Sequence, residues 1–453
     1  MGVCLSYSTK DTILKLLGGH FMDKTVEELK KGKTIRGTGD NWDMKIKPSS
    51  MRALTQNIDL HLFASNLIVN RLDFTHLPND QPIGKIEDFS LTKALLNENE
   101  WQTYGENSQV LISRILMEFF PKFSIFKDVY PDHIDHDYSK EMKQKSIIAT
   151  LPVIDADEKK YQDCIKILRT YEYWIWELYH KAGLADAVPE IEVDVALSSN
   201  HARPGQPHAE VVHTKDDPMK ANKIVFSGDQ LTRIRFAGAK DLLKGSHTPT
   251  DRLEHCSPFK PVGWHTKASL LQYTYNLLYS AQSVNESGTL KYFREKLNRK
   301  NVTPVKVVDS YQGSEELFIS MGKGYIVSAA LKFFGMSSLD DTPADFPSSD
   351  DSDDTIKAYF TSKMDSFVKL YVLQRDYDNS NADDYVQNYA LMTIFFTVLI
   401  LQMKDAVAEG DGSRNLINQK MLMVVFKALN EKSKYAIEMF TSIAQIELDS
   451  REF

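Results

Sequence analysis

The segment from Lys223 to Asp229 constrains the fold of this chain more than any other. It reads Lys-Ile-Val-Phe-Ser-Gly-Asp, a short apolar run that ends in Gly-Asp. Such a run is typical of a strand that is buried on both faces and delivers a carboxylate at its carboxyl-terminal edge. We therefore expect a sheet with layers packed against it and Asp229 at the edge of that sheet.

Helical periodicity dominates the sequence after Asp229. Apolar residues recur there at spacings of three and four residues, which is the pattern of amphipathic helices. Together with the buried strand, this pattern predicts an α/β protein with a large helical part. A strand is expected only at 302–308, and helices are expected at 269–283, 289–299, 314–334, 356–373, 384–407 and 415–429.

The residues before the buried strand mix both kinds of element. At 34–46, β-branched residues, paired glycines and late alternation indicate a strand, or a tight strand pair, with aspartates at one end. Strict alternation at 190–195 predicts a half-exposed strand. Helices are expected at 11–33, 107–120 and 158–182.

An acidic stretch interrupts the helical part of the sequence. Residues 338–354 hold seven aspartates and two prolines and no basic residue. Because such a stretch has little apolar surface to bury, we expect a solvated and mobile linker there.

Composition limits the compartment and the partners of the chain. The 54 basic and 62 acidic residues give a formal net charge of −8, which argues against a surface that binds a polyanion everywhere. Three cysteines, at 4, 164 and 256, cannot form a disulfide framework and indicate a reducing compartment, so we expect an intracellular protein of the nucleus or cytoplasm. The most apolar run, 390–401, is short for a bilayer span, so we expect a buried core helix and no membrane partner.

Three groups of carboxylates are candidates for metal-dependent chemistry. Two or three carboxylates that converge from distant positions suit phosphoryl transfer with Mg²⁺, because hard divalent ions prefer oxygen ligands. Spacing alone leaves a structural alternative open for each group: an aspartate after a strand often caps a helix, and Glu-Gly-Asp-Gly is a plausible helix end with Gly410 as its terminator. The groups are Asp40 with Asp43, Asp229, and Asp405 with Glu409 and Asp411.

Several short motifs recur in an order that carries a family resemblance. The chain resembles a large family of transposon-associated invertebrate proteins that carry a domain of unknown function. The likeness covers nearly the full length, and Gly-Asp-Gln-Leu-Thr at 228–232 is its most specific piece. In longer relatives the first motif lies well inside the chain, which implies an upstream segment. The motifs lie at 2–7, 40–43, 59–63, 138–142, 228–232, 334–336 and 409–412.

The resemblance implies a fold and a set of catalytic residues. Such proteins are similar to diverged DDE/D transposases, whose catalytic domain has the ribonuclease H-like fold. Carried over by position, Asp40 is the first catalytic acid and Asp229 the second. Glu409 is the third, with Asp411 as its competitor. Mg²⁺ or Mn²⁺ would then be held by Asp40, Asp43, Asp229 and Glu409.

The same resemblance implies a division of the chain and a departure from the pattern. Many such transposases have a Cys or Asp three residues before a His after the second acid, whereas here Val262 precedes His265. The expected fold is a ribonuclease H-like α/β core interrupted by a large, mostly helical insertion. The expected parts are an N-terminal helical segment 1–33, a first core part 34–242, an insertion 243–337 and 355–381 around the linker 338–354, and a C-terminal helical part of the core 382–453.

Two functions from different classes follow from this reading. The first is a transposase-derived, metal-dependent nuclease or strand transferase that acts on DNA. The second is a binding or scaffold protein that keeps the fold and has lost the chemistry. Net acidity, the missing residue before His265 and the lack of a recognisable DNA-binding motif in this sequence favour the second. The densest basic stretch, 291–306, is a candidate for contact with a phosphate backbone, but the sequence favours a solvated helix face there.

Overall fold

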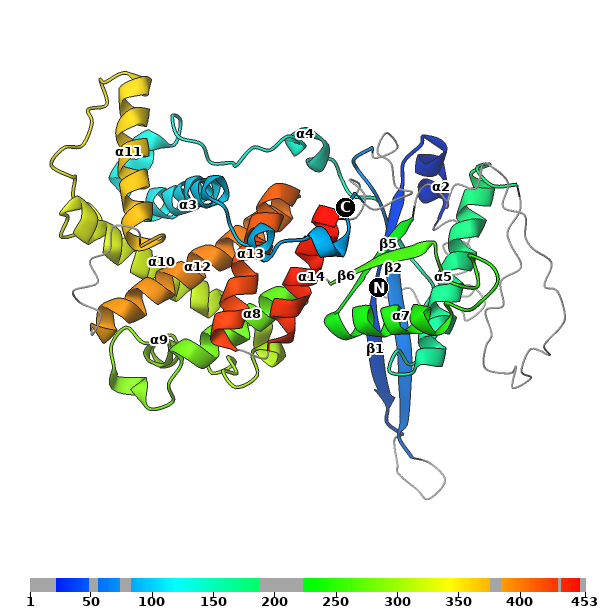
Figure 1. Ribbon diagram of the computed structural model, residues 1–453. Helices are drawn as coiled ribbons and strands as arrows, with labels where there is room; N and C mark the ends of the chain where they lie inside the picture. The colour runs from blue at the N-terminus through cyan, green and yellow to red at the C-terminus, as the bar shows by residue number, and fades with distance from the viewer. Residues whose placement is uncertain are drawn as a thin grey trace, which may run out of the picture. The chain divides into compact units, whose positions relative to one another are not determined.

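A computed structural model describes residues 22–48, 56–73, 83–186, 223–261, 263–374, 384–430 and 433–448. The chain is a mixed α/β protein that divides into two compact units (Figure 1). Unit 1 comprises Met1–Asp88, Gln144–Val262 and Ala444–Phe453, and unit 2 comprises Phe89–Lys143 and Gly263–Ile443.

A single mixed sheet organises the described part of unit 1. Its strand order is β3-β2-β1-β5-β6, and β4 pairs with β2 beside that path. The pairs β1–β2, β2–β3 and β2–β4 are antiparallel, whereas β1–β5 and β5–β6 are parallel. The strands are β1 Ile35–Ile46, β2 Ile58–Val69, β3 Ile148–Thr150, β4 Ile154–Asp155, β5 Ile224–Gly228 and β6 Cys256–Pro261.

One face of this sheet packs against helices α5 (Tyr161–Lys181) and α7 (Gln230–Leu242). Tyr171 of α5 stacks on Phe226 of β5 with ring centroids 4.7 Å apart, and Phe236 of α7 contacts Phe259 of β6. Gly37 of β1 is required here, because a side chain at this position would collide with the Phe226 ring. The apolar core of unit 1 therefore lies between the sheet and these two helices. Helix α2 (Asp23–Lys30) packs on α5.

The predicted strand at Lys223–Phe226 is confirmed as β5, but its burial differs from the expectation. Ile224, Phe226 and Gly228 are buried, whereas Val225 and Ser227 are half-buried. The prediction of burial on both faces was wrong for the described residues, because α5 and α7 cover only the face that carries Phe226.

The predicted strand at 34–46 is also confirmed, as the long strand β1. Residues 41–46 of β1 pair with β2 in a long ribbon, to which β4 adds only at Leu62 and Phe63 of β2, and β5 joins β1 only at Gly37 and Thr38 (Figure 1). Trp42, Met44 and Ile46 of this ribbon are exposed.

Unit 2 is helical, as the periodicity after Asp229 predicts. The strand expected at 302–308 was wrong, because this segment is a loop that ends in the 3₁₀ turn Val307–Ser310 with Val307 buried in the helical core. The helices are α3 Glu98–Phe119, α4 Ser139–Met142, α8 Gly263–Leu278, α9 Leu290–Lys296, α10 Tyr311–Phe334, α11 Asp353–Tyr371, α12 Tyr385–Glu409, α13 Gly412–Leu429 and α14 Lys434–Leu448, whose last residues belong to unit 1.

Helices α10 and α12 cross closely in the core of unit 2. Gly322 of α10 faces Thr397 of α12, and a methyl group at Gly322 would overlap the Thr397 side chain. Two helical segments, Val307–Phe334 and Tyr385–Glu409, are long and apolar enough to cross a membrane by length and composition, and 39% and 61% of their most apolar windows are buried. Core helices of soluble proteins have the same length and composition.

The acidic segment 338–354 is folded into consecutive turns where we expected a mobile linker. Phe346 stacks on Phe123 with ring centroids 5.6 Å apart. Asp341 accepts hydrogen bonds from the backbone N–H groups of Ser337 and Ser338, so its charge stabilises a turn. The aspartates act here as turn caps and helix-start residues, and one aromatic side chain anchors the segment to the core.

The units group the residues differently from the expected layout. Residues 89–143 lie within the expected first core part, 34–242, but belong to unit 2. Of the expected C-terminal core part, 382–453, only Ala444–Phe453 belongs to unit 1. The strand expected at 190–195 lies outside the described residues.

Candidate functional site

Asp40 and Asp229 lie on neighbouring parallel strands. Thr38 of β1 pairs with Ser227 of β5, and each aspartate follows two residues further along its chain. Both aspartates are half-buried. Gly228 permits this approach, because a Cβ atom there would lie 2.8 Å from Cβ of Thr232 and 3.2 Å from the Gly39 carbonyl oxygen. The structure thus brings the first two predicted acids together where β5 ends.

Asp229 is also the N-cap of helix α7. Its Oδ1 accepts a hydrogen bond from the backbone N–H of Thr232 at 2.6 Å. A carboxylate at this position satisfies an orphan N–H group and interacts favourably with the helix dipole. The capping alternative considered from the sequence is therefore confirmed, and it uses one of the two carboxylate oxygens.

A third carboxylate, Glu158, completes the group, and the sequence reasoning missed it. It lies between β4 and α5 and is 3% exposed. Its Oε2 accepts a hydrogen bond from Thr232 Oγ1 at 2.6 Å, and its Oε1 accepts one from Arg235 Nη1 at 2.8 Å. Helix α7 thus holds Glu158 through two side chains of its first turns.

The pKa of the Glu158 carboxyl depends on its burial and on the charges around it. Burial raises the pKa of this carboxyl, and the negative charges of Asp229 and Asp40 raise it further, against the opposing effect of Thr232 and Arg235. Glu158 is therefore within electrostatic reach of both Asp40 and Asp229. The only signal in the sequence is the acidic run at 155–158 before a helix, which is equally typical of a turn.

Asp43 lies apart from this group. It is three residues from Asp40, so the two side chains point to opposite faces of β1. Its Oδ1 lies 2.7 Å from His61 Nδ1, and its Oδ2 lies 3.2 Å from Lys159 Nζ. Hydrogen bonds from these two groups lower the pKa of Asp43. The structure does not bring Asp43 to the face of Asp40.

Glu409 belongs to unit 2 and is the last residue of α12. Gly410 ends this helix in the left-handed conformation, with φ 71°, as the helix-end alternative predicts. Oε1 of the Glu409 side chain lies 3.6 Å from Nδ1 of His133. The backbone carbonyl oxygen of Glu409 lies 3.2 Å from Nε2 of His136. These contacts lie within unit 2.

Asp411, also in unit 2, is part of a buried ion network. It caps α13 by accepting the backbone N–H of Arg414, and its other oxygen lies 2.7 Å from Arg414 Nε. Arg414 Nη1 contacts Asp405 at 2.6 Å, and Asp405 also pairs with Arg114. Burial raises the pKa of Asp405, but hydrogen bonds from both arginines outweigh it and lower the pKa. The geometry gives Asp411 a structural role in joining α12 to α13.

Other ligating side chains add no metal site in the described part of the chain. Within it, no group of three or more His, Cys, Asp or Glu side chains has the geometry to hold a metal ion. Cys256 is a buried free thiol, and His255 lies 3.4 Å from the buried carboxylate of Glu172. His201, His208 and His213 lie outside the described residues, as does Val262.

The basic stretch 291–306 is largely neutralised by acids. Its charged side chains form ion pairs with nearby carboxylates, so it presents less positive charge than the sequence indicates. The pairs are Lys291 and Arg294 with Glu295, Arg299 with Glu316, and Lys306 with Asp309.

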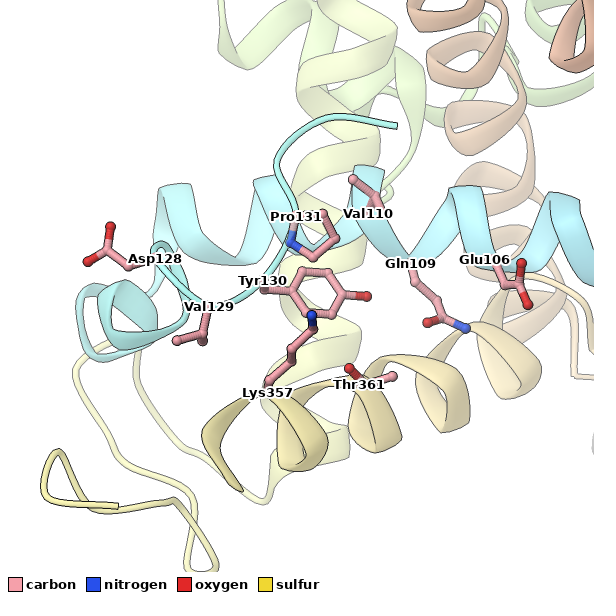
Figure 2. A pocket seen from close by; sticks show the side chains of 9 residues that line it. All are labelled: Glu106, Gln109, Val110, Asp128, Val129, Tyr130, Pro131, Lys357 and Thr361. Atoms are coloured by element: carbon pink, nitrogen blue, oxygen red, sulfur yellow. The ribbon is translucent and has the colours of Figure 1, made fainter. Parts of the chain in front are cut away.

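A pocket of about 480 Å³ opens in unit 2 between α3, α11 and the loop after the 3₁₀ helix Pro121–Phe126. Tyr130 lies in the middle of this pocket with Lys357 beside its ring, and Glu106 of α3 lies at one end of the pocket (Figure 2). Burial raises the pKa of Tyr130 to about 12. None of the carboxylates predicted from the sequence lines this pocket.

These features define an α/β protein of two compact units. Three carboxylates, Asp40, Asp229 and Glu158, cluster where the parallel strand β5 ends. The chain belongs to a family of unknown function, DUF6589, whose model matches residues 80–452. The match includes β5, Asp229, Glu158 and unit 2, and it begins after Asp40 and β2. No curated protein and no solved structure matches the chain.

Proposed function

We propose that the protein is a transposase-derived, metal-dependent nuclease or DNA strand transferase with a ribonuclease H-like core in unit 1. The single observation that carries the proposal is the register of β1 and β5. It sets Asp40 beside Asp229 at the end of a parallel strand, with the buried Glu158 in electrostatic reach of both.

The sheet plan supports the fold part of the proposal. Three strands, β3, β2 and β1, are antiparallel, and β5 and β6 add in parallel on the other side of β1. Helix α5 precedes β5 in the chain, and α7 connects β5 to the parallel strand β6. From this order and these directions we infer a ribonuclease H-like core, with the helices of unit 2 as additions to it.

The carboxylates supply the chemistry that the proposal needs. Asp40 and Asp229 present oxygen ligands of the kind that Mg²⁺ and Mn²⁺ prefer. A bound cation would polarise a phosphodiester and stabilise the charge that develops on its oxygens. In the reaction, a water or 3′-hydroxyl oxygen forms a bond to phosphorus while the opposite P–O ester bond breaks.

Glu158 sets how much negative charge gathers at this site. Its negative charge, added to those of Asp40 and Asp229, makes the group electrostatically unfavourable without a cation. Arg235 and Thr232 fix the Glu158 carboxyl at the side of α7 and offset part of this repulsion. A divalent cation at the aspartates would relieve the rest.

Metal titration followed by thermal unfolding tests the proposal. A ligand that binds only the folded state raises the melting temperature. We expect Mg²⁺ or Mn²⁺ to stabilise the wild type but not Asp40→Asn or Asp229→Asn. Asp43→Asn is the matched control, because it removes the same charge from the other face of β1 and should keep the response. An equal response in all four proteins would refute the site.

A binding or scaffold protein that has lost the chemistry is the second candidate. The observation that favours it is the Glu158–Arg235 ion pair, which engages one carboxylate of the group with a protein cation. In that case the wild type shows no stabilisation by Mg²⁺ or Mn²⁺ and no cleavage of DNA. For either function we propose DNA as the partner and the nucleus or cytoplasm as the compartment.

A further inference from the structure

We propose that the sheet face opposite α5 and α7 binds the phosphodiester backbone of a nucleic-acid strand. The inference deepens the proposed function and rests on it for the class of ligand. The binding groups form a polar row, one side chain from each of five neighbouring strands, in the order Thr150, Asn66, Thr38, Ser227 and Lys260.

The strand register establishes the row. Asn66 of β2 pairs with Thr150 of β3 on one side and with Thr38 of β1 on the other. Ser227 of β5 pairs with Thr38 and with Lys260 of β6. Directly paired residues point to the same face of a sheet, so the five side chains form one line across it.

The neighbouring row shows how unusual this line is. The adjacent row lies one residue forward on the antiparallel strand β2 and one residue back on the other four strands, and its members, Ala149, Leu67, Gly37, Phe226 and Phe259, are all buried. By contrast, Thr150 of the polar row is exposed and its other four members are half-buried. Sheets with parallel pairs normally carry apolar residues on both faces because layers cover both. Five polar side chains in line therefore indicate a face that meets a polar ligand.

The chemistry of the row matches phosphate oxygens. Hydroxyl, amide and ammonium groups are the side-chain donors that contact nucleic-acid backbones, and the row contains no carboxylate. Strands lie about 4.8 Å apart, so the row spans about 19 Å, enough for a linear polyanion rather than a single ion.

The position of the row links it to the carboxylates. Asp40 follows Thr38 by two residues and lies on the same face, about 7 Å further along β1. Arg36 precedes Thr38 by two residues on that face and is exposed. The positive charge of Arg71 lies within electrostatic reach of Arg36, and two adjacent cations favour an anion beside them. A backbone held along the row would pass between these arginines and Asp40.

Fluorescence anisotropy with a fluorescein-labelled single-stranded DNA 20-mer tests the inference on the full chain. EDTA is present throughout, so metal binding and cleavage contribute nothing to the signal. The row variants are Thr38→Val with Asn66→Leu, which keep side-chain size but remove donors, and Lys260→Met. The controls, Asn41→Leu and Lys45→Met, change the same residue types on the opposite face of β1. Melting curves verify that each variant folds, and Ser227→Ala replaces the double variant if that protein does not.

We expect the double variant to raise Kd about tenfold, since each lost hydrogen bond to phosphate weakens binding several-fold. Lys260→Met should raise Kd and reduce the slope of log Kd against log salt concentration by about one phosphate contact. The controls should bind as the wild type does. The inference is wrong if the wild type does not bind the 20-mer at low salt, if the row variants bind like the wild type, or if the controls weaken binding equally.

The DNA-binding experiment and the metal titration test different proposals, so the failure of one proposal can be told from the failure of the other. Loss of DNA binding in the row variants with a normal metal response in melting supports both proposals. Metal-stabilised wild type with unchanged DNA binding in the row variants overturns the row and leaves the proposed nuclease standing. Row-dependent DNA binding without any metal response keeps the row and points to the binding protein.

Discussion

Arg235 Nη1 donates a hydrogen bond to Glu158 Oε1 at 2.8 Å, from the same helix that Asp229 caps. Thr232 adds a second bond to Glu158 and gives its backbone N–H to Asp229. The first turns of α7 therefore position two of the three carboxylates. Any distortion of this helix start would move both together.

Glu158→Gln should flatten the dependence of stability on pH. The pKa of Glu158 is raised in the folded protein, so its stabilising contribution is complete below the unfolded pKa and is lost as pH rises through the folded one. The melting temperature of the wild type should fall as pH rises through that window, and the melting temperature of the variant should fall less. Melting curves from pH 4 to 8, on the order of one unit apart, measure this. Glu106→Gln, at an exposed carboxyl of unit 2, is the control, and an unchanged wild-type slope in Glu158→Gln would contradict the assignment.

Substitutions of Asp229 should separate its capping role from its charge. Asp229→Ala removes the N-cap acceptor and should lower the free energy of unfolding by about 1 kcal/mol. Asp229→Asn keeps an acceptor that caps almost as well, so its apo stability should lie within about 0.5 kcal/mol of the wild type. Urea unfolding without divalent cations checks both. Equal losses in the two variants would show that the charge, rather than the cap, stabilises α7.

The sequence predicted those parts of the fold that local pattern determines. The apolar run before Gly228 and Asp229 identified β5 and its terminal carboxylate, because burial and a tight strand-to-helix turn leave a local signature. Most helices of unit 2 were found from their periodicity for the same reason, but α4 and α14 were not predicted. Gly410 was anticipated as a helix terminator, since only the left-handed conformation was needed there.

Other elements depend on tertiary context and left little signal. Strand β6 contains Pro258 and Pro261, which argue against a strand, yet β6 lies at the end of the strand order where proline is tolerated. Strands β3 and β4 span three and two residues, too short for alternation to appear. Glu158 joins the site only because Thr232 and Arg235 of α7 bind its carboxyl, and no spacing in the sequence encodes that contact.

Two glycines of α10 should respond to alanine in opposite directions. Gly322→Ala places a methyl group against Thr397 of α12, so we expect a loss of about 1–3 kcal/mol in the free energy of unfolding. Gly324→Ala, two residues away, meets open space and should gain up to about 1 kcal/mol from helix propensity. Denaturant unfolding followed by circular dichroism compares the pair. Similar effects at both positions would mean that α10 and α12 do not cross at Gly322.

The buried ion network of unit 2 should be its most sensitive polar feature. Arg414 is 3% exposed and bridges Asp411 and Asp405 at 2.7 and 2.6 Å. Arg414→Met leaves two buried carboxylates without this partner, so we expect a loss of about 3–5 kcal/mol in the free energy of unfolding. The loss should persist at high salt, because solvent ions screen buried charges weakly.

Arg299→Met is the matched comparison for this network. Arg299 pairs with Glu316 at 2.9 Å, but the two side chains are 35% and 49% exposed. An exposed pair contributes about 0–1 kcal/mol, so this variant should unfold nearly as the wild type does. Urea unfolding at low and high salt distinguishes the two arginines. If Arg414→Met were as mild as Arg299→Met, the structural role assigned to Asp411 in this network would be wrong.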